Sequence, residues 1–322
     1  MISHKKKISY ILFPILSLLI FFLIFYFFIV DKINKFQNLN IQSTGLANKY
    51  IKLRNVNINY IEKGKEGNNI VFLHGLGGNT STFRYCIEKI SKNNKIYALD
   101  LKGFGYSERP LNSNYSLEEQ AKILLEFLNK KNITKVIAVG HSMGGEITLL
   151  VYNMNPEKFS KIILIDSSGL ENSPRFLLKF INQPIVDVIY YNLFNKESSF
   201  RKVLRTLFFD DTLIDKEVVQ NYYTPFKIEN SNKAYLNIMK GFKRYNISDI
   251  LVDISIPTLV IWGENDTWID VKYGYKFNKL IKNSKLEIIP EAGHLCIEEK
   301  HDITNKIIED FINEELKFHL RI

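Results

Sequence analysis

A serine flanked by glycines stands at a predicted strand-to-helix turn in the middle of the chain. The segment GHSMG, residues 140–144, follows the apolar run Lys135–Val139 and precedes the helical pattern Glu146–Asn153. A sharp turn of this kind strains its central residue and needs neighbours without a β-carbon. It would present the Ser142 hydroxyl above a sheet as a nucleophile, whereas a glycine-rich turn with an incidental serine is the alternative.

A histidine late in the chain could supply the base that a serine nucleophile needs. His294 lies in a loop after the apolar run Leu286–Ile289, where it could reach the serine and take its proton. His301 and His319 fall in the final helical pattern and are interpreted as solvent-exposed, and His141 as the spacer of the turn.

A carboxylate is needed to orient that histidine and to stabilise its imidazolium form. Asp266 follows the apolar run Thr258–Trp262, between Ser142 and His294 in the chain, and is the predicted partner. The alternatives are carboxylates in the same or a neighbouring loop: Asp166, Glu264 and Asp270.

A glycine-rich segment after another apolar run could bind the negative charge that builds up on a carbonyl oxygen. HGLGG, residues 74–78, follows Ile70–Leu73, and its glycines let backbone N–H groups approach a substrate closely. The predicted oxyanion donors are the backbone N–H groups of Leu76 and Met143. The residues of the loop that would support them are His74, in a structural role, Gly75 and Gly77.

These loops require a scaffold in which strands and helices alternate. Short β-rich runs alternate with helical patterns from Lys49 onward, and most later runs are continuously apolar, as in parallel strands buried on both faces. The pattern predicts an α/β fold. The eight predicted strands are Lys49–Leu53, Asn57–Ile61, Ile70–Leu73, Ile96–Leu99, Lys135–Val139, Lys161–Ile165, Thr258–Trp262 and Leu286–Ile289.

Helix signals separate the runs. Ser116 and Glu119 form a capping box for a helix towards Asn129, and Ile297–Leu316 has amphipathic spacing. Between the sixth and seventh strands the alternation stops, and residues 169–248 carry helical runs such as Phe176–Ile181 and Val186–Phe194. We predict a helical cap there, inserted into a core formed by residues 49–168 and 249–322.

The N-terminus predicts a membrane anchor. Three lysines precede an uncharged run from Ile8 to Val30, which as a helix would reach roughly 34 Å, enough to cross a bilayer. A cleaved signal peptide is the rival interpretation, but no small-residue cleavage site follows the run directly. We expect residues 1–30 to be a single-pass anchor and residues 31–48 a tether. The lysine distribution favours an extracytoplasmic domain.

Composition excludes several classes of protein. The chain has 322 residues, of which 46% are hydrophobic and 24% charged, which is a globular composition. The net charge is +9, but no clustered basic helix or aromatic platform predicts nucleic-acid binding. Two cysteines, Cys86 and Cys296, exclude a disulfide framework and a cysteine-based zinc site, while leaving one disulfide open. No metal or organic cofactor is predicted, because acyl transfer by a serine needs none and the sequence carries no cofactor motif; neither glycine-rich loop fits a phosphate-binding motif.

Five motifs together resemble the α/β-hydrolase superfamily. They are HGLGG at 74–78, DLKGFGYSERP at 100–110, GHSMGG at 140–145, WGENDTWI at 262–269 and EAGHLCIEE at 291–299. The resemblance covers the chain from about Ile51 onward and implies an eight-stranded, mostly parallel sheet with a helical lid. It also implies that Ser142 is the nucleophile, His294 the base and Asp266 its partner. Haloalkane dehalogenases and epoxide hydrolases resemble this pattern but place an aspartate at the nucleophile position.

A finer resemblance concerns the substrate. The N-terminal apolar run, GHSMGG, the segment SGL at 168–170 and a short cap are similar to membrane-anchored monoacylglycerol lipases. This implies a serine esterase acting on lipid or acylglycerol esters through an acyl-enzyme. Bacterial ring-cleavage C–C hydrolases share much of the pattern, so a C–C bond or amide hydrolase is the alternative. A non-catalytic receptor or signalling protein on the same fold is a third interpretation.

Overall fold

The computed structural model describes residues 48–170, 196–240 and 247–314. Its strands are β1 (Asn48–Leu53), β2 (Val56–Lys63), β3 (Asn69–Leu73), β4 (Lys95–Leu99), β5 (Val136–His141), β6 (Phe159–Ile165), β7 (Thr258–Gly263) and β8 (Ser284–Ile289). Its α-helices are α2 (Arg84–Ile90), α3 (Leu117–Lys130), α4 (Met143–Met154), α7 (Glu197–Leu204), α8 (Lys216–Phe226), α9 (Ser231–Lys240), α10 (Ile247–Val252), α11 (Lys272–Leu280), α12 (Cys296–Glu299) and α13 (His301–Asn313). Short 3-10 helices cover Thr80–Phe83, Pro156–Lys158 and Asp211–Leu213.

The described strands form an eight-stranded sheet in the order β1-β2-β4-β3-β5-β6-β7-β8. Only β2 runs against its neighbours: it pairs antiparallel with β1 and β4, and every other pairing is parallel. The predicted α/β fold with an eight-stranded, mostly parallel sheet is therefore confirmed. Because parallel strands end at the same edge, the loops after β3, β5, β7 and β8 are brought to one side of the molecule.

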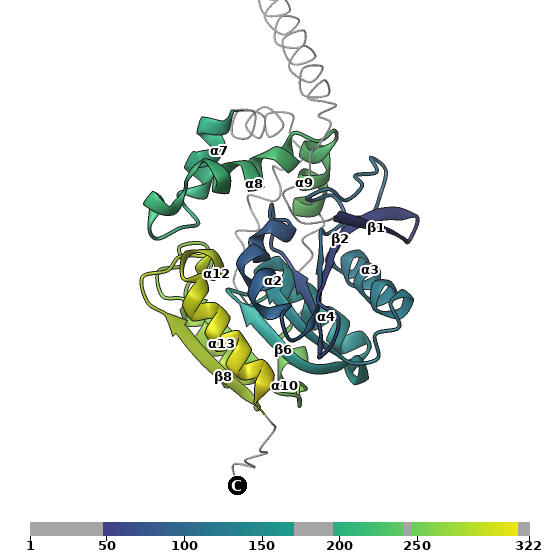
Figure 1. The fold of residues 1–322 in the computed structure, drawn as a ribbon, viewed down its shortest axis with the longest axis vertical. Helices are drawn as coiled ribbons and strands as arrows, with labels where there is room; N and C mark the ends of the chain where they lie inside the picture. The colour runs from purple at the N-terminus through teal and green to yellow at the C-terminus, as the bar shows by residue number, and fades with distance from the viewer. Residues whose placement is uncertain (1–47, 171–195, 241–246, 315–322) are drawn as a thin grey trace, which may run out of the picture.

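Helices cover both faces of the sheet (Figure 1). Alternate residues of the central strands enter two separate apolar clusters, as the side-chain period of two requires. Val71 and Leu73 of β3 join the cluster built with α3, α4 and α11, whereas Ile70 and Phe72 join the cluster built with α2 and α13. Burial on both faces explains why these strands are continuously apolar in sequence.

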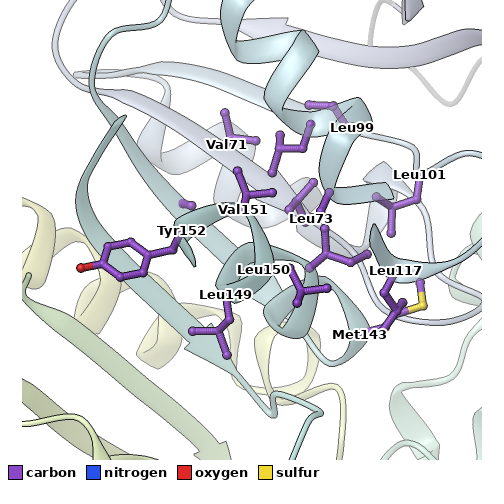
Figure 2. Close-up of a cluster of buried hydrophobic side chains, with 14 of the residues drawn as sticks. Val71, Leu73, Leu99, Leu101, Leu117, Met143, Leu149, Leu150, Val151 and Tyr152 are labelled. Atoms are coloured by element: carbon purple, nitrogen blue, oxygen red, sulfur yellow. The ribbon is translucent and has the colours of Figure 1, made fainter. Parts of the chain in front are cut away.

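The first of these clusters positions the start of α4. Figure 2 shows Leu73 with Leu150 and Val151 of α4, and Met143 beside Leu117 of α3. Met143 is 1% exposed, so its side chain anchors the first turn of α4 in the core. The backbone N–H of Met143, one of the predicted oxyanion donors, is thereby fixed at the end of β5.

Two helix predictions have different outcomes. The predicted helix start is confirmed, because the Ser116 hydroxyl accepts a hydrogen bond from the backbone N–H of Glu119 at 3.3 Å at the start of α3. The reciprocal half of the capping box is not formed, because the Ser116 N–H donates to Asn114 Oδ1 and the Glu119 carboxylate binds Arg54. The single helix predicted over 297–316 is wrong. The backbone leaves the helical region at Lys300 (φ −123°, ψ 44°), so α12 and α13 are separate, and residues 315 and 316 lie outside the described part. The break lets both helices bury apolar side chains against the sheet.

Between β6 and β7 the described residues form helices, and Figure 1 shows α7, α8 and α9 gathered at one end of the sheet. We call residues 169–248 the cap region. The predicted runs Phe176–Ile181 and Val186–Phe194 lie outside the described residues. An apolar cluster of its own holds the cap region together, with Phe200 and Leu204 of α7 against Val219 and Tyr222 of α8.

The predicted anchor and tether, residues 1–30 and 31–48, lie almost wholly outside the described residues, which begin at Asn48. No helix within 48–170, 196–240 or 247–314 has the length and apolar character to span a bilayer. The two cysteines are both buried and unpaired with each other. The Cys86 thiol donates to Asn305 Oδ1 at 2.7 Å, and the Cys296 thiol donates to Asp166 Oδ2 at 3.0 Å.

Candidate active site

Ser142 occupies the junction of β5 and α4 with a strained backbone. Its φ of 52° and ψ of −121° lie in a region that residues with a β-carbon rarely adopt. The backbone N–H of Ser142 donates to Ile165 O at 2.9 Å, and its carbonyl accepts from Gly145 N at 2.9 Å and Ser168 N at 3.1 Å. These three bonds to α4 and to the end of β6 hold the turn in place.

Close backbone contacts explain the glycines beside the serine. A β-carbon at Gly144 would lie 2.1 Å from Leu73 O, so the start of α4 packs directly on the end of β3. A β-carbon at Gly75 would lie 2.8 Å from Ser142 Cβ and 3.3 Å from Ser142 Oγ. The predicted oxyanion loop and the predicted nucleophile are therefore in direct contact.

His294 and Asp266 form a buried hydrogen-bonded pair. The Nδ1–H of His294 donates to Asp266 Oδ2 at 2.7 Å, with 5% and 0% of the two side chains exposed. The other carboxylate oxygen, Oδ1, accepts from the backbone N–H groups of Trp268 at 2.7 Å and Ile269 at 2.9 Å. These bonds fix the tautomer, so that Nε2 is the basic nitrogen of His294.

The alternative carboxylates have other partners. Asp166 is fully buried, but its two oxygens accept from Gly263 N at 2.8 Å and from the Cys296 thiol. Burial, and then the charge of Asp266, raise the pKa of Asp166 well above its usual range. Asp270 bonds Lys272 at the surface, and Glu264 is exposed. Among these four residues, Asp266 is the one hydrogen-bonded to His294.

His141 joins the serine turn to the histidine loop. Its Nε2–H donates to the carbonyl oxygen of His294 at 2.8 Å, and the two ring centroids are 4.9 Å apart. Burial, and then the charge of His294, lower the pKa of His141 to about 3. The residue before Ser142 thus does more than space the turn, because it is hydrogen-bonded directly to the backbone of His294.

His74 orients the oxyanion loop. The backbone N–H of Leu101 donates to His74 Nε2 at 2.9 Å, so the proton must be on Nδ1, which donates to Gly75 O at 2.7 Å. Gly78 N also donates to Gly75 O, at 3.1 Å. In a trans peptide the carbonyl and the following N–H point in opposite directions, so these bonds turn the N–H of Leu76 away from His74. Burial lowers the pKa of His74 and favours this neutral form.

Gly77 marks the border between the oxyanion loop and the cap region. Its φ is +75°, and a β-carbon there would lie 3.3 Å from the Phe226 ring and 3.6 Å from the Tyr235 ring. A small pocket opens at this border. Its lining includes Gly77, Gly78, Phe104, Arg109, Phe226 and Tyr235.

Trp268 is a site residue to which the sequence analysis assigned no role. Its ring stacks on His294, with centroids 5.9 Å apart and planes inclined by 16°, and its indole N–H donates to Thr206 Oγ1 of the cap region at 3.0 Å. Trp268 lies in the motif WGENDTWI, but its partners His294 and Thr206 are far from it in sequence, so local sequence spacing does not indicate these contacts. The described residues hold no group of three or more potential metal ligands.

Comparison with known proteins agrees with this arrangement. A family model described as alpha/beta hydrolase fold matches residues 68–301. An uncharacterized hydrolase of Bacillus subtilis (strain 168), YugF, is 32% identical over 248 residues, which cover 76% of this chain and 89% of that protein.

Two further relatives extend over more of the chain. The 2-hydroxy-6-oxo-6-(2'-aminophenyl)hexa-2,4-dienoic acid hydrolase of Metapseudomonas resinovorans is 28% identical over 295 residues, which cover 89% of this chain and 96% of that protein. The crystal structure of a serine hydrolase involved in carbazole degradation superposes with a TM-score of 0.71 at 25% identity, covering 83% of this chain and 98% of that chain.

Proposed function

This chain belongs to the α/β-hydrolase family and is a hydrolase, and we propose that it cleaves carboxylic esters with Ser142, His294 and Asp266 as a catalytic triad. The observation that carries the proposal is the 2.7 Å hydrogen bond from His294 Nδ1 to Asp266 Oδ2 in the loop that His141 ties to the serine turn. A base oriented by a carboxylate beside a strained serine is the arrangement that acyl transfer requires.

In the first step, Ser142 Oγ forms a bond to the ester carbonyl carbon while its proton passes to His294 Nε2. Asp266 stabilises the imidazolium that results. The N–H groups of Leu76 and Met143 bind the oxyanion, assisted by the N-terminus of α4. As the tetrahedral intermediate collapses, the carbon–oxygen bond breaks and His294 gives its proton to the leaving alcohol.

In the second step, water attacks the acyl-enzyme. His294 accepts a proton from that water, and the oxyanion forms again between the same two N–H groups. Collapse releases the acid and returns the proton to Ser142 Oγ. Each of these steps uses side chains and backbone groups that this chain itself provides.

The acyl chain would lie against the aromatic side chains that surround the small pocket beside Gly77. Phe104, Phe226 and Tyr235 give this pocket aromatic walls next to the predicted oxyanion donor Leu76. These aromatic rings favour an acyl chain, while Arg109 and Ser231 make another part of the lining polar. Together with the resemblance to membrane-anchored monoacylglycerol lipases, the aromatic rings support lipid or acylglycerol esters as substrates. Anchoring through residues 1–30, with the domain outside the cytoplasm, stays a prediction from the sequence.

A second candidate is hydrolysis of a carbon–carbon bond. The relative from Metapseudomonas resinovorans, which is named for a hexadienoic acid substrate, is similar over 96% of its own length. The same triad and oxyanion donors would serve that reaction, so the two candidates differ in substrate rather than in machinery.

The deciding experiment compares the wild type with Ser142→Ala on three substrate sets: p-nitrophenyl esters of increasing chain length, monoacylglycerols, and a 2-hydroxy-6-oxo-dienoate. We expect ester turnover that favours medium or long acyl chains and disappears in Ser142→Ala. Turnover of the dienoate alone, with Ser142 still labelled by a fluorophosphonate, would replace the ester proposal by the carbon–carbon one. Ester turnover that survives in Ser142→Ala would reject Ser142 as the nucleophile.

A further inference from the structure

The loop that carries His294 is bonded on both sides of the histidine. The backbone N–H of Gly293 donates to Glu299 Oε1 at 2.7 Å, and the backbone N–H of Leu295 donates to Leu207 O of the cap region at 3.2 Å. The His294 carbonyl between them accepts the bond from the serine turn described above. Three consecutive residues are thus held by three different partners, which leaves the histidine little freedom to move.

Glu299 connects this loop to the cap region through a single carboxylate. While Oε1 accepts from Gly293, Oε2 accepts from the backbone N–H groups of Phe209 at 2.7 Å and Asp210 at 3.1 Å. The residue is buried, at 8% exposure. Hydrogen bonds to a charged acceptor are stronger than neutral ones, so the carboxylate joins the two segments firmly.

The two segments are also packed backbone to backbone. A β-carbon at Gly293 would lie 2.6 Å from Leu207 O and 2.9 Å from Phe209 N. Leu295 belongs to the apolar cluster of the cap region, where it packs with side chains of α7 and α8. The loop that carries His294 therefore packs against the cap region on one side, while it follows β8 at the edge of the sheet on the other.

We propose that Glu299 is a positioning residue for His294: its carboxylate fixes the loop between Gly293 and Leu295 against residues 207–210, and so aligns the imidazole with Ser142. This inference rests on the proposed function, in which His294 is the general base. A displacement of about 1 Å of a reacting group can cost on the order of 100-fold in rate. Both oxygens of Glu299 accept hydrogen bonds, so the position needs a carboxylate. An amide there would place its NH₂ group against the N–H of Gly293 or against those of Phe209 and Asp210, where it cannot accept.

The test uses Glu299→Gln, which keeps the size and shape of the side chain, beside Glu291→Gln as a matched control. Glu291 precedes the same loop, is 74% exposed at its side chain and pairs with Lys300. We expect Glu299→Gln to lower kcat by about tenfold or more, with KM changed by less than about threefold. Glu291→Gln should keep kcat within about twofold, since surface ion pairs contribute little.

A spectroscopic readout separates alignment from general stability. Trp268 stacks on His294, and the other of the chain's two tryptophans, Trp262, is fully buried. A protonated imidazole quenches indole emission, so the pH-dependent part of the emission reports His294, and Trp268→Phe gives the background. We expect Glu299→Gln to alter this pH-dependent emission at temperatures where the protein is folded. A purely structural role would lower the melting temperature and leave the emission profile unchanged.

Unchanged kcat and an unchanged emission profile in folded Glu299→Gln would overturn the positioning role. Ester turnover that survives in Ser142→Ala would instead overturn the proposed function, so the two failures are distinguishable. Should Glu299→Gln not fold, hydrogen exchange of the wild type decides the question. The backbone N–H groups of Gly293, Phe209 and Asp210 should exchange slowly, and exchange at the rate of an open loop would overturn the inference.

Discussion

Gly75 stands directly against Ser142: a β-carbon on residue 75 would lie 2.8 Å from the Ser142 β-carbon and 3.0 Å from His141 Nδ1. Both neighbours are buried, so neither can move away easily. We expect Gly75→Ala to displace the serine or the oxyanion loop and to lower kcat/KM by about 100-fold or more, the size of effect seen when one oxyanion donor is lost. Steady-state ester hydrolysis measures this, and full activity in Gly75→Ala would contradict the packing.

Asp266→Asn should remove the acceptor that fixes the tautomer of His294. An amide at this position can leave the basic nitrogen on the wrong side of the ring, so we expect kcat to fall about 10³- to 10⁴-fold. Asp270→Asn is the control, because Asp270 lies in the same loop but is 53% exposed at its side chain. Equal losses in the two variants would mean that the loop, and not the hydrogen bond, determines the activity.

His141 should make the protein less stable in acid. The pKa of His141 is lowered from its ordinary value of 6.5 to about 3 in the folded protein, so between those pH values only the unfolded chain takes up the proton. The free energy of unfolding therefore falls as the pH drops from 6.5 towards 3, by at most about 1.4 kcal/mol per pH unit for this group. In His141→Gln, whose amide can still donate to His294 O, denaturant titrations should show a shallower fall. Parallel curves for the two proteins would show that His141 does not contribute.

Tyr222 should stabilise the contact of α8 with α12 and with the 3-10 helix Thr80–Phe83. Its hydroxyl donates to Glu298 Oε1 and lies 3.1 Å from Thr82 Oγ1, and Arg84 bonds the other oxygen of Glu298 at 2.9 Å. Tyr222→Phe leaves a buried carboxylate with one partner fewer, so we expect a loss of about 1–3 kcal/mol in the free energy of unfolding. Tyr275→Phe, at a position that is 58% exposed, should change stability by less than about 0.5 kcal/mol.

The predicted anchor can be tested by truncation. Removing residues 1–35 should leave the hydrolysis of soluble p-nitrophenyl esters unchanged, since the candidate site is built entirely from later residues. Turnover of esters embedded in lipid vesicles should fall, because the enzyme would no longer be concentrated at the surface. An equal loss on both substrates would argue against anchoring and for a role of these residues in folding.

Local patterns were enough to predict the sheet. The bounds of every predicted strand lie within two residues of the observed ones, because each is a β-rich run, most of them continuously apolar, with glycine or polar residues at its ends. The serine turn and the loops after β3, β7 and β8 were predictable for the same reason: their position at strand ends follows from sequence alone. The break at Lys300 was not predictable, because apolar residues recur at helical spacing on both sides of it and no glycine or proline marks the end of α12.

The contacts that fix the histidine depend on tertiary structure. Glu299 and Phe209 are 90 residues apart, and Trp268 and Thr206 are 62 apart, so neither pair leaves a trace in local spacing. The choice of Asp266 over Asp166 likewise needed side-chain geometry. Both carboxylates follow buried strands, and only their hydrogen-bond partners distinguish them.

Both thiols of the chain are sealed inside the folded protein. Cys86 and Cys296 are 0% exposed, and burial raises the pKa of each, so neither presents a thiolate to solvent. Maleimide or iodoacetamide should therefore leave folded molecules unmodified and alkylate only unfolded ones. The fraction of alkylated protein then measures the unfolded fraction of a preparation. Because neither native thiol reacts in the folded protein, a single cysteine introduced at an exposed position, for example by Tyr275→Cys, would be the only thiol available for attaching a dye or a surface.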